Sequence, residues 1–252
     1  MNNYTITETY TLPSKGLIYK QKVNPEVQLR SMLTSEEMKR LSPSDYEYKN
    51  LCEIMDSCIV SKLGISAYDL CLGDYQFLLH KLRTITYGSE YKMSVRCPYC
   101  GAVKKLTLNL DDLKTKEYDE KLKSLFSCEL KMTKHKVTLN FMTPRLQDEI
   151  LKKEKDYEKE HPDCANQTLV FTLYALIDTV DGMILSVAEK ESFVRKLPMG
   201  DANIILRYAE KFNNEVGLDP SFQVECDQCG EKFGSSFRYT SEFFGPTVDF
   251  GW

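Results

Sequence analysis

The feature that most constrains this chain is a pair of matching cysteine motifs far apart in the sequence. Cys97–Gly101 (CPYCG) and Cys226–Gly230 (CDQCG) share the pattern C-x-x-C-G. Four thiolates in two such pairs form the ligand set of one tetrahedral Zn²⁺. The glycine after each second cysteine permits the tight turn that a metal-binding knuckle needs. The sequence therefore predicts one structural zinc ion, held by Cys97, Cys100, Cys226 and Cys229.

Strand-like segments flank both motifs in the same arrangement. Residues 91–96 lead into the first motif, and residues 105–110 leave it with alternating polar and apolar side chains. Residues 222–225 and 232–239 flank the second motif in the same way. We therefore expect a zinc ribbon of two β-hairpins, split by a long insertion.

Other interpretations of these cysteines stay open at this point. Cys97–Cys100 has the CPYC sequence of glutaredoxins, whose reactive thiol lies at a helix N-terminus. Here a glycine and a strand-like run follow, and a second C-x-x-C exists, so redox chemistry is disfavoured. A disulfide and a chance pairing of unrelated motifs are two further alternatives. A catalytic zinc is disfavoured, because four cysteines leave no open position for water.

Composition narrows the function classes. A net charge of −4 argues against nonspecific nucleic-acid binding, which relies on a basic surface. No apolar run approaches the roughly 18 residues of a membrane span, and the N-terminus has no signal-peptide pattern. The remaining cysteines lie in apolar or helical patterns typical of reduced thiols in a cytosolic product: Cys52, Cys58, Cys71, Cys128 and Cys164.

Local patterns before the first motif predict an extended N-terminus and then helices. The N-terminus turns at Leu12–Gly16 and forms either an edge hairpin or an arm that lies on a partner. Thr34–Glu37 matches a capping box, with the Thr34 hydroxyl at the N-cap and Glu37 reaching back. Asp74 is expected to cap a later helix that ends near Gly88. His80, within that helix, is expected to be a packed or surface residue rather than a ligand.

The insertion has its own helix and strand signals. Residues 111–125 are charged and predicted helical, and a polar helix should run from Pro144 to about Glu160. Two strands are expected over 128–132 and 136–141. Residues 169–177 are apolar nearly all round, which indicates a buried helix. A further core stripe follows helical spacing: Ile204, Ile205, Tyr208, Ala209, Phe212 and Val216.

The C-terminal tail is rich in aromatic residues, and its glycines and proline prevent a helix. It packs on its own ribbon, or it docks into a partner, because aromatic anchors dominate interface energetics. The predicted partner-binding residues combine this tail with the N-terminal turn: Phe243, Phe244, Phe250, Trp252, Leu12 and Tyr19.

No enzyme motif is present. The chain lacks the phosphate-binding, dinucleotide-binding, zinc-protease and nucleophile-elbow patterns, and none of its three histidines sits beside a plausible nucleophile. We therefore predict a protein without enzymatic activity and without a small-molecule substrate.

Short motifs in order carry a resemblance to a known family. They are Leu12–Gly16 with Tyr19, Leu29-Arg30, Thr34 with Glu36-Glu37, Asp56–Ile59, Leu72, Asp74–Leu79, Lys81–Arg83, Thr86–Gly88, Tyr91 and the first C-x-x-C. With them, residues 10–101 resemble the T4-type bacteriophage baseplate hub subunit family. The resemblance implies a tail baseplate component or a hub-assembly factor, located in the virion or in the host cytoplasm during assembly. Its partners would be other baseplate or tail hub proteins, and no catalytic residue is implied.

The sequence thus predicts an α+β protein with a helical N-terminal unit and a split Zn(Cys)₄ ribbon interrupted by an α+β insertion. The expected boundaries are an arm over 1–30, a helical unit over 31–90, a ribbon over 91–110 plus 221–242, an inserted domain over 111–220 and a tail over 243–252. The alternative function is a nucleic-acid-binding or transcription-related zinc ribbon, with flanking cations at Lys104, Lys105, Lys232 and Arg238. A third is thiol-disulfide exchange by Cys97 and Cys100.

Overall fold

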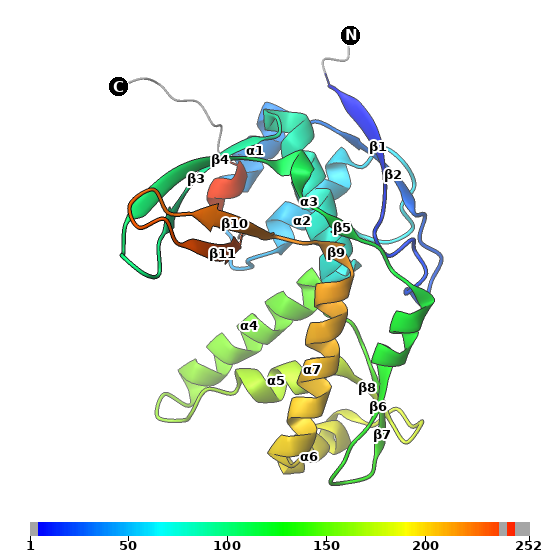
Figure 1. Cartoon of the computed structure of the whole chain (residues 1–252). Helices are drawn as coiled ribbons and strands as arrows, with labels where there is room; N and C mark the ends of the chain where they lie inside the picture. The colour runs from blue at the N-terminus through cyan, green and yellow to red at the C-terminus, as the bar shows by residue number, and fades with distance from the viewer. Residues whose placement is uncertain (1–4, 237–240, 245–252) are drawn as a thin grey trace.

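The computed structural model describes residues 5–236 and 241–244 and has the predicted α+β architecture (Figure 1). Helices alternate with small antiparallel sheets, four of two strands and one of three within the described residues. In the parts of the chain at 5–236 and 241–244, no helix combines the length and apolar character needed to cross a membrane.

The N-terminus forms an antiparallel hairpin. Strand β1 (Thr7–Thr11) pairs with β2 (Glu26–Arg30), with Thr9 opposite Gln28. β2 alternates exposed and buried side chains, so Val27 and Leu29 enter the first core while β1 stays largely exposed. The N-terminal segment is therefore an edge hairpin of its own chain.

Three helices follow, and α3 is the centre of the first core. They are α1 (Thr34–Arg40), α2 (Lys49–Cys58) and α3 (Leu72–Tyr87), with the 3₁₀ turn η1 (Ala67–Asp69) before α3. Most of α3 is buried, against β2, α2 and the short C-terminal 3₁₀ helix η4 (Ser241–Phe244). This core therefore joins residues from both ends of the chain.

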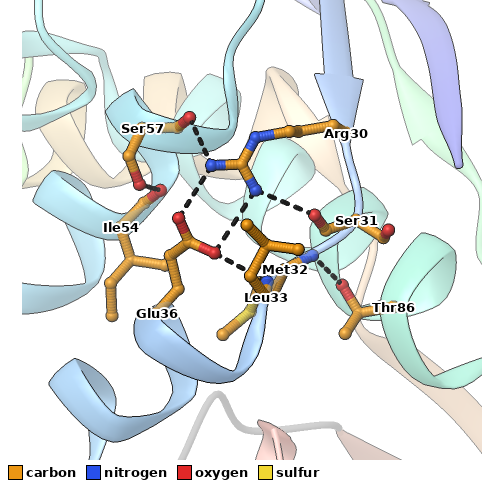
Figure 2. Close-up of polar contacts among 8 residues, drawn as sticks. All are labelled: Arg30, Ser31, Met32, Leu33, Glu36, Ile54, Ser57 and Thr86. Carbon is orange, nitrogen blue, oxygen red and sulfur yellow. Dashed lines mark hydrogen bonds and ion pairs between the residues drawn. The ribbon is translucent and has the colours of Figure 1, made fainter. Parts of the chain in front are cut away.

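Polar contacts fix the end of β2 to the three helices (Figure 2). The Arg30 guanidinium donates to the Glu36 carboxylate at 2.7 Å and to the Ser57 carbonyl at 2.9 Å. The Met32 amide donates to the Thr86 hydroxyl at 3.1 Å. Because these partners lie in α1, α2 and α3, Arg30 and Met32 connect the end of β2 to all three helices.

The capping box at the start of α1 lies one residue before the predicted position. The N-cap of α1 is Leu33, whose amide donates to Glu36 at 2.6 Å. The expected pair of Thr34 and Glu37 is therefore wrong. The physical reason is that Arg30 draws the Glu36 carboxylate to the start of the helix, while Glu37 pairs with Arg40.

Two hairpins carry the cysteine motifs. The first is β3 (Glu90–Arg96) with β4 (Val103–Asn109), and the second is β10 (Ser221–Glu225) with β11 (Lys232–Ser236). Each is a separate antiparallel sheet. They share a small core that includes Val95, Val224 and Phe233, which packs the hairpins together beside the cysteines.

The segment between the hairpins holds a second core. Its elements are η2 (Leu110–Asp112), β5 (Thr115–Lys116), η3 (Glu120–Phe126), β6 (Ser127–Glu129), β7 (Lys136–Leu139), α4 (Pro144–Glu160), α5 (Thr168–Leu176), β8 (Ile177–Val180), α6 (Val187–Lys196), α7 (Met199–Glu215) and β9 (Gly217–Leu218). Strands β6, β7 and β8 form one antiparallel sheet, and helices α4, α5 and α7 pack beside it (Figure 1).

The predicted helix over residues 111–125 is wrong. The structure has two 3₁₀ segments there, η2 and η3, separated by β5. The two residues of β5 pair with β9, about a hundred residues later in the chain. This long-range pairing holds Thr115 and Lys116 extended, so a continuous helix cannot form.

Helix α7 returns the chain from the second core to α3. Its predicted stripe is confirmed at Ile205 and Phe212, which are 0% and 3% exposed. Just after the helix, Gly217 adopts a φ of +114° and lies against Gly73 of α3. A side chain at either glycine would collide with the other segment's backbone, so this contact requires two glycines.

Candidate metal centre

Each cysteine motif forms the same knuckle at the tip of its hairpin. In the first, the Cys97 amide donates to the Ala102 carbonyl at 2.8 Å, and the Gly101 amide donates to the Cys97 carbonyl at 3.0 Å. The second knuckle repeats both bonds at equivalent positions, each at 2.9 Å. Gly101 and Gly230 have φ values of +76° and +72°, a region that favours glycine. The two knuckles are thus near-equivalent units that face each other.

The four sulfur atoms gather at one point, as the sequence predicts. All lie within 4.8 Å of one another, with Cys97 Sγ 3.8 Å from Cys229 Sγ and Cys100 Sγ 3.6 Å from Cys226 Sγ. A tetrahedral zinc with Zn–S bonds of about 2.3 Å places its sulfurs about 3.8 Å apart. The two shortest separations match this spacing, so the cluster is compatible with a Zn(Cys)₄ site.

The surroundings of the sulfurs favour metal binding. Cys97 and Cys226 are buried, while Cys100 and Cys229 face solvent. The backbone amides of Cys229 and Gln228 donate to the Cys226 sulfur and lower the pKa of that thiol to about 6. The neighbouring sulfurs raise the pKa of Cys100 and Cys229, so the amides favour the thiolate form, which binds metal, at Cys226 alone of these three.

An ion pair links the two knuckles beside the cysteines. The Lys104 ammonium, on β4, donates to the Asp227 carboxylate at 2.6 Å and to the Glu225 carbonyl at 2.8 Å. Lys232 pairs with Glu225 within the second hairpin. Lys104 and Lys232 are two of the cations that the nucleic-acid alternative required. Their charges are matched locally, which weakens that alternative.

The knuckle geometry also bears on redox chemistry. Cys97 and Cys100 lie in a turn between β3 and β4, so the helix N-terminus that activates a catalytic C-x-x-C is not at this position. A redox pair would also leave Cys226 and Cys229 beside it without a role. The arrangement of four cysteines is compatible with a closed, structural metal site.

Phe243 and Phe244 pack within their own chain rather than forming an exposed docking segment, which was one of the two outcomes left open by the sequence. Phe243 and Phe244 are buried at 0% and 1% exposure, packed in the first core with α3. The prediction that they present themselves to a partner is wrong, because their own chain already covers them. Phe250 and Trp252 lie outside the described residues.

Arg83 holds this C-terminal segment in place. Its guanidinium is fully buried and donates to main-chain carbonyls of Phe243 at 3.2 Å, of Glu90 at 3.0 Å and of Gly88. The ring of Tyr91 lies 5.4 Å from the guanidinium carbon. Burial lowers the pKa of Arg83, and these acceptors satisfy the buried cation. No local sequence pattern signals this contact, since it joins residues 160 positions apart.

The N-terminal turn is also fixed internally. Leu12 is 1% exposed, so it is a core residue rather than a docking residue, contrary to expectation. The carboxylate of Asp74, buried in α3, accepts the Ser14 amide at 2.9 Å and the Tyr19 hydroxyl at 2.7 Å. Asp74 thus holds this loop, whereas the N-cap of α3 is Cys71. Within the loop, Leu17 is 63% exposed and is available to a partner.

A cleft of about 990 Å³ lies between the N-terminal turn and the insertion. Four of the charged residues that line it form two ion pairs, Lys20 with Asp178 and Arg145 with Asp69. His80 is buried in α3, and its Nε2 bonds the Leu110 carbonyl at 2.9 Å. It is the packed histidine that was expected, away from the cysteines.

Comparison with known proteins gave one family. The family described as T4 bacteriophage base plate protein matches residues 2–245. This match extends the resemblance seen at residues 10–101 through the insertion and the second knuckle. No curated protein and no solved structure matched the chain.

Proposed function

The chain belongs to the T4 bacteriophage base plate protein family, and from this premise we propose that it is a structural or assembly component of the central hub region of a contractile-tailed phage baseplate. Family membership indicates a structural role in the baseplate and a location in the virion tail. The hub position rests on the resemblance of residues 10–101 to hub subunits. Assembly in the host cytoplasm, by contacts with other baseplate or tail hub proteins and without catalysis, belongs to the same proposal.

One structural zinc ion is the second part of the proposal. Cys97, Cys100, Cys226 and Cys229 would hold it, and the sulfur separations of 3.6 and 3.8 Å support this assignment. The metal would join the two ends of the insertion, because β4 directly precedes the insertion in the chain and β10 directly follows it. Apparent zinc binding of about 10–16 kcal/mol in small domains is coupled to their folding. A zinc ion would therefore fix the insertion relative to the helical unit.

Partner contacts are the third part. Because Phe243 and Phe244 are buried, docking through the tail rests on Phe250 and Trp252. On the N-terminal turn, the exposed Leu17 replaces the buried Leu12 as the contact residue. Tyr19 would support the turn through its hydroxyl bond to Asp74 rather than bind the partner itself. The binding surface would thus combine residues from the two ends of the chain.

Complementation of a phage that lacks this protein tests the proposal. Host cells would supply the wild-type chain or a chain that ends at Phe244, and baseplates would be counted by electron microscopy. We expect the wild type to restore baseplates and the truncated chain to fold but fail. A matched variant, Ile184→Ser, changes an exposed side chain far from both ends and should assemble normally. Normal baseplates without any supplied chain would contradict the baseplate role, and full rescue by the truncated chain would contradict tail docking.

A further inference from the structure

The outer edge of β1 is an open edge of the two-stranded β1–β2 sheet. β1 lies at the outside of the molecule (Figure 1), and within the described residues it pairs with β2 alone. The register with β2 runs through Thr7–Thr11 without a bulge. One side of this strand therefore carries backbone groups that no described strand pairs.

The hydrogen-bond pattern identifies which residues point outward. The Ile6 carbonyl accepts the Ser31 amide at 2.8 Å, so Ile6 faces β2. On β2, the Gln28 carbonyl accepts the Val60 amide at 2.9 Å, so Gln28 faces away from β1. Thr9, the cross-strand partner of Gln28, therefore directs its backbone amide and carbonyl away from β2. This follows because opposite residues of an antiparallel ladder alternate between hydrogen-bonded and non-hydrogen-bonded pairs.

The same alternation assigns the rest of the strand. Glu8 and Tyr10 bond to β2, while Thr7, Thr9 and Thr11 direct their amides and carbonyls to the open edge. The three threonines are solvent-exposed and are good strand formers. Natural edges are usually blocked by lysine, proline or a bulge, and β1 has none of these, with Glu8 its single charge.

We propose that this edge pairs with β1 of a second copy of the chain, antiparallel, about a twofold axis at Thr9. In that register Thr9 lies opposite its own counterpart, and Thr7 lies opposite Thr11. The outward amides and carbonyls of these residues then satisfy one another across the axis. The result is a continuous four-stranded sheet across an isologous contact. Such a sheet is more stable than a two-stranded hairpin, which is marginal by itself.

The symmetric order of the outward residues favours a second copy over a foreign strand, because Thr7 and Thr11 repeat about Thr9. Centring on Thr9 places Glu8 of one chain opposite Tyr10 of the other, so the glutamates are not directly opposed. The same pair already bonds within one chain, where the Tyr10 hydroxyl donates to the Glu8 carboxylate at 2.5 Å. That bond already uses the Tyr10 hydroxyl proton, so what this register provides is the absence of opposed like charges.

A charge exchange at the axis tests the register. Thr9 is exposed, so Thr9→Lys and Thr9→Glu should both fold, yet each puts like charges directly opposite across the axis. We expect the full-length wild type to dimerise, each variant alone to be monomeric, and an equal mixture of the two to dimerise again, by sedimentation velocity at the same concentration. Thr9→Val, which keeps the backbone groups and the branched shape, should dimerise like the wild type.

Two results would overturn the proposal. One is a wild type that stays monomeric throughout a concentration series. The other is a lysine and glutamate mixture that behaves like its separate components. If Thr9→Pro abolishes capture of another baseplate protein while the wild type is monomeric, the edge binds a foreign strand instead. Sedimentation velocity uses the purified protein without phage, so its result does not depend on whether the baseplate role is correct.

Discussion

Buried carboxylates connect segments that are far apart in the sequence. Asp148 of α4 accepts the amides of Glu47, Tyr48 and Lys49 at the start of α2, at 2.8 to 3.2 Å. Asp201 of α7 accepts amides of the β6–β7 turn in the same way. A buried charge is tolerated only when such donors surround it. Each of these residues therefore fixes the position of one element against another.

Replacement of Asp148 tests this role. Asp148→Ala should lower the free energy of unfolding by about 3 kcal/mol, because buried amides at the start of α2 lose a charged acceptor. Glu158→Ala, on an exposed position of the same helix, should change it by less than about 0.5 kcal/mol. Urea unfolding measures both. Equal effects of the two substitutions would contradict the assignment.

His80 gives a pH dependence with a definite sign. Burial lowers its pKa to about 4, from a usual value near 6.5. Between these pH values the unfolded chain binds a proton that the folded chain does not, so stability is lost as the pH falls from 6.5 towards 4. The loss from this residue reaches about 3 kcal/mol. His80→Gln should flatten the pH dependence of unfolding relative to wild type, and parallel profiles would contradict this.

At the scale of elements, the sequence predicted what local patterns control. The long helix α4 begins at Pro144 and ends at Glu160 as expected, since proline at its start and its charge pattern are local signals. The four cysteines converge as the spacing and the glycines of the two knuckles predicted. Hairpin strands around both motifs followed from alternation of polar and apolar residues.

Two of the errors share a long-range cause. Residues 111–125 have helix-forming composition, yet pairing of β5 with β9 keeps part of them extended. Phe243 and Phe244 look like a free tail, yet both rings are buried and Arg83 binds the Phe243 carbonyl. No local pattern reports a partner about a hundred or more residues away. The domain boundaries proposed from the sequence stay predictions, and bonds such as those of Asp148 cross them.

Helix α7 offers a test of core packing within one element. Ile205→Ala and Phe212→Ala should each lower the free energy of unfolding by about 2–5 kcal/mol, because both side chains are buried. Asn203→Ala, on the exposed side of the helix, is the matched control. Denaturant unfolding would report the difference. A cost below about 0.5 kcal/mol at Phe212 would mean that its side chain is not packed.

At the scale of the whole molecule, the chain closes on itself twice. The two knuckles bring the ends of the insertion together, and η4 places Ser241–Phe244 against α3. Phe243→Ala should therefore lower the free energy of unfolding by about 3–5 kcal/mol. A chain that ends at Phe244 should keep its melting temperature, since it retains both buried rings. If the chain that ends at Phe244 is destabilised more than Phe243→Ala, the structural contact lies in residues 245–252.

Zinc content of the purified full-length protein tests the central claim most directly. Elemental analysis should find about one zinc per chain, because four thiolates form one tetrahedral site. Cys100→Ser should lose the metal and unfold at lower denaturant concentration, while Cys52→Ser, at a buried cysteine in the first core, should keep it. A metal-free wild-type protein that is fully folded, with stability unaffected by added zinc or chelator, would contradict the account.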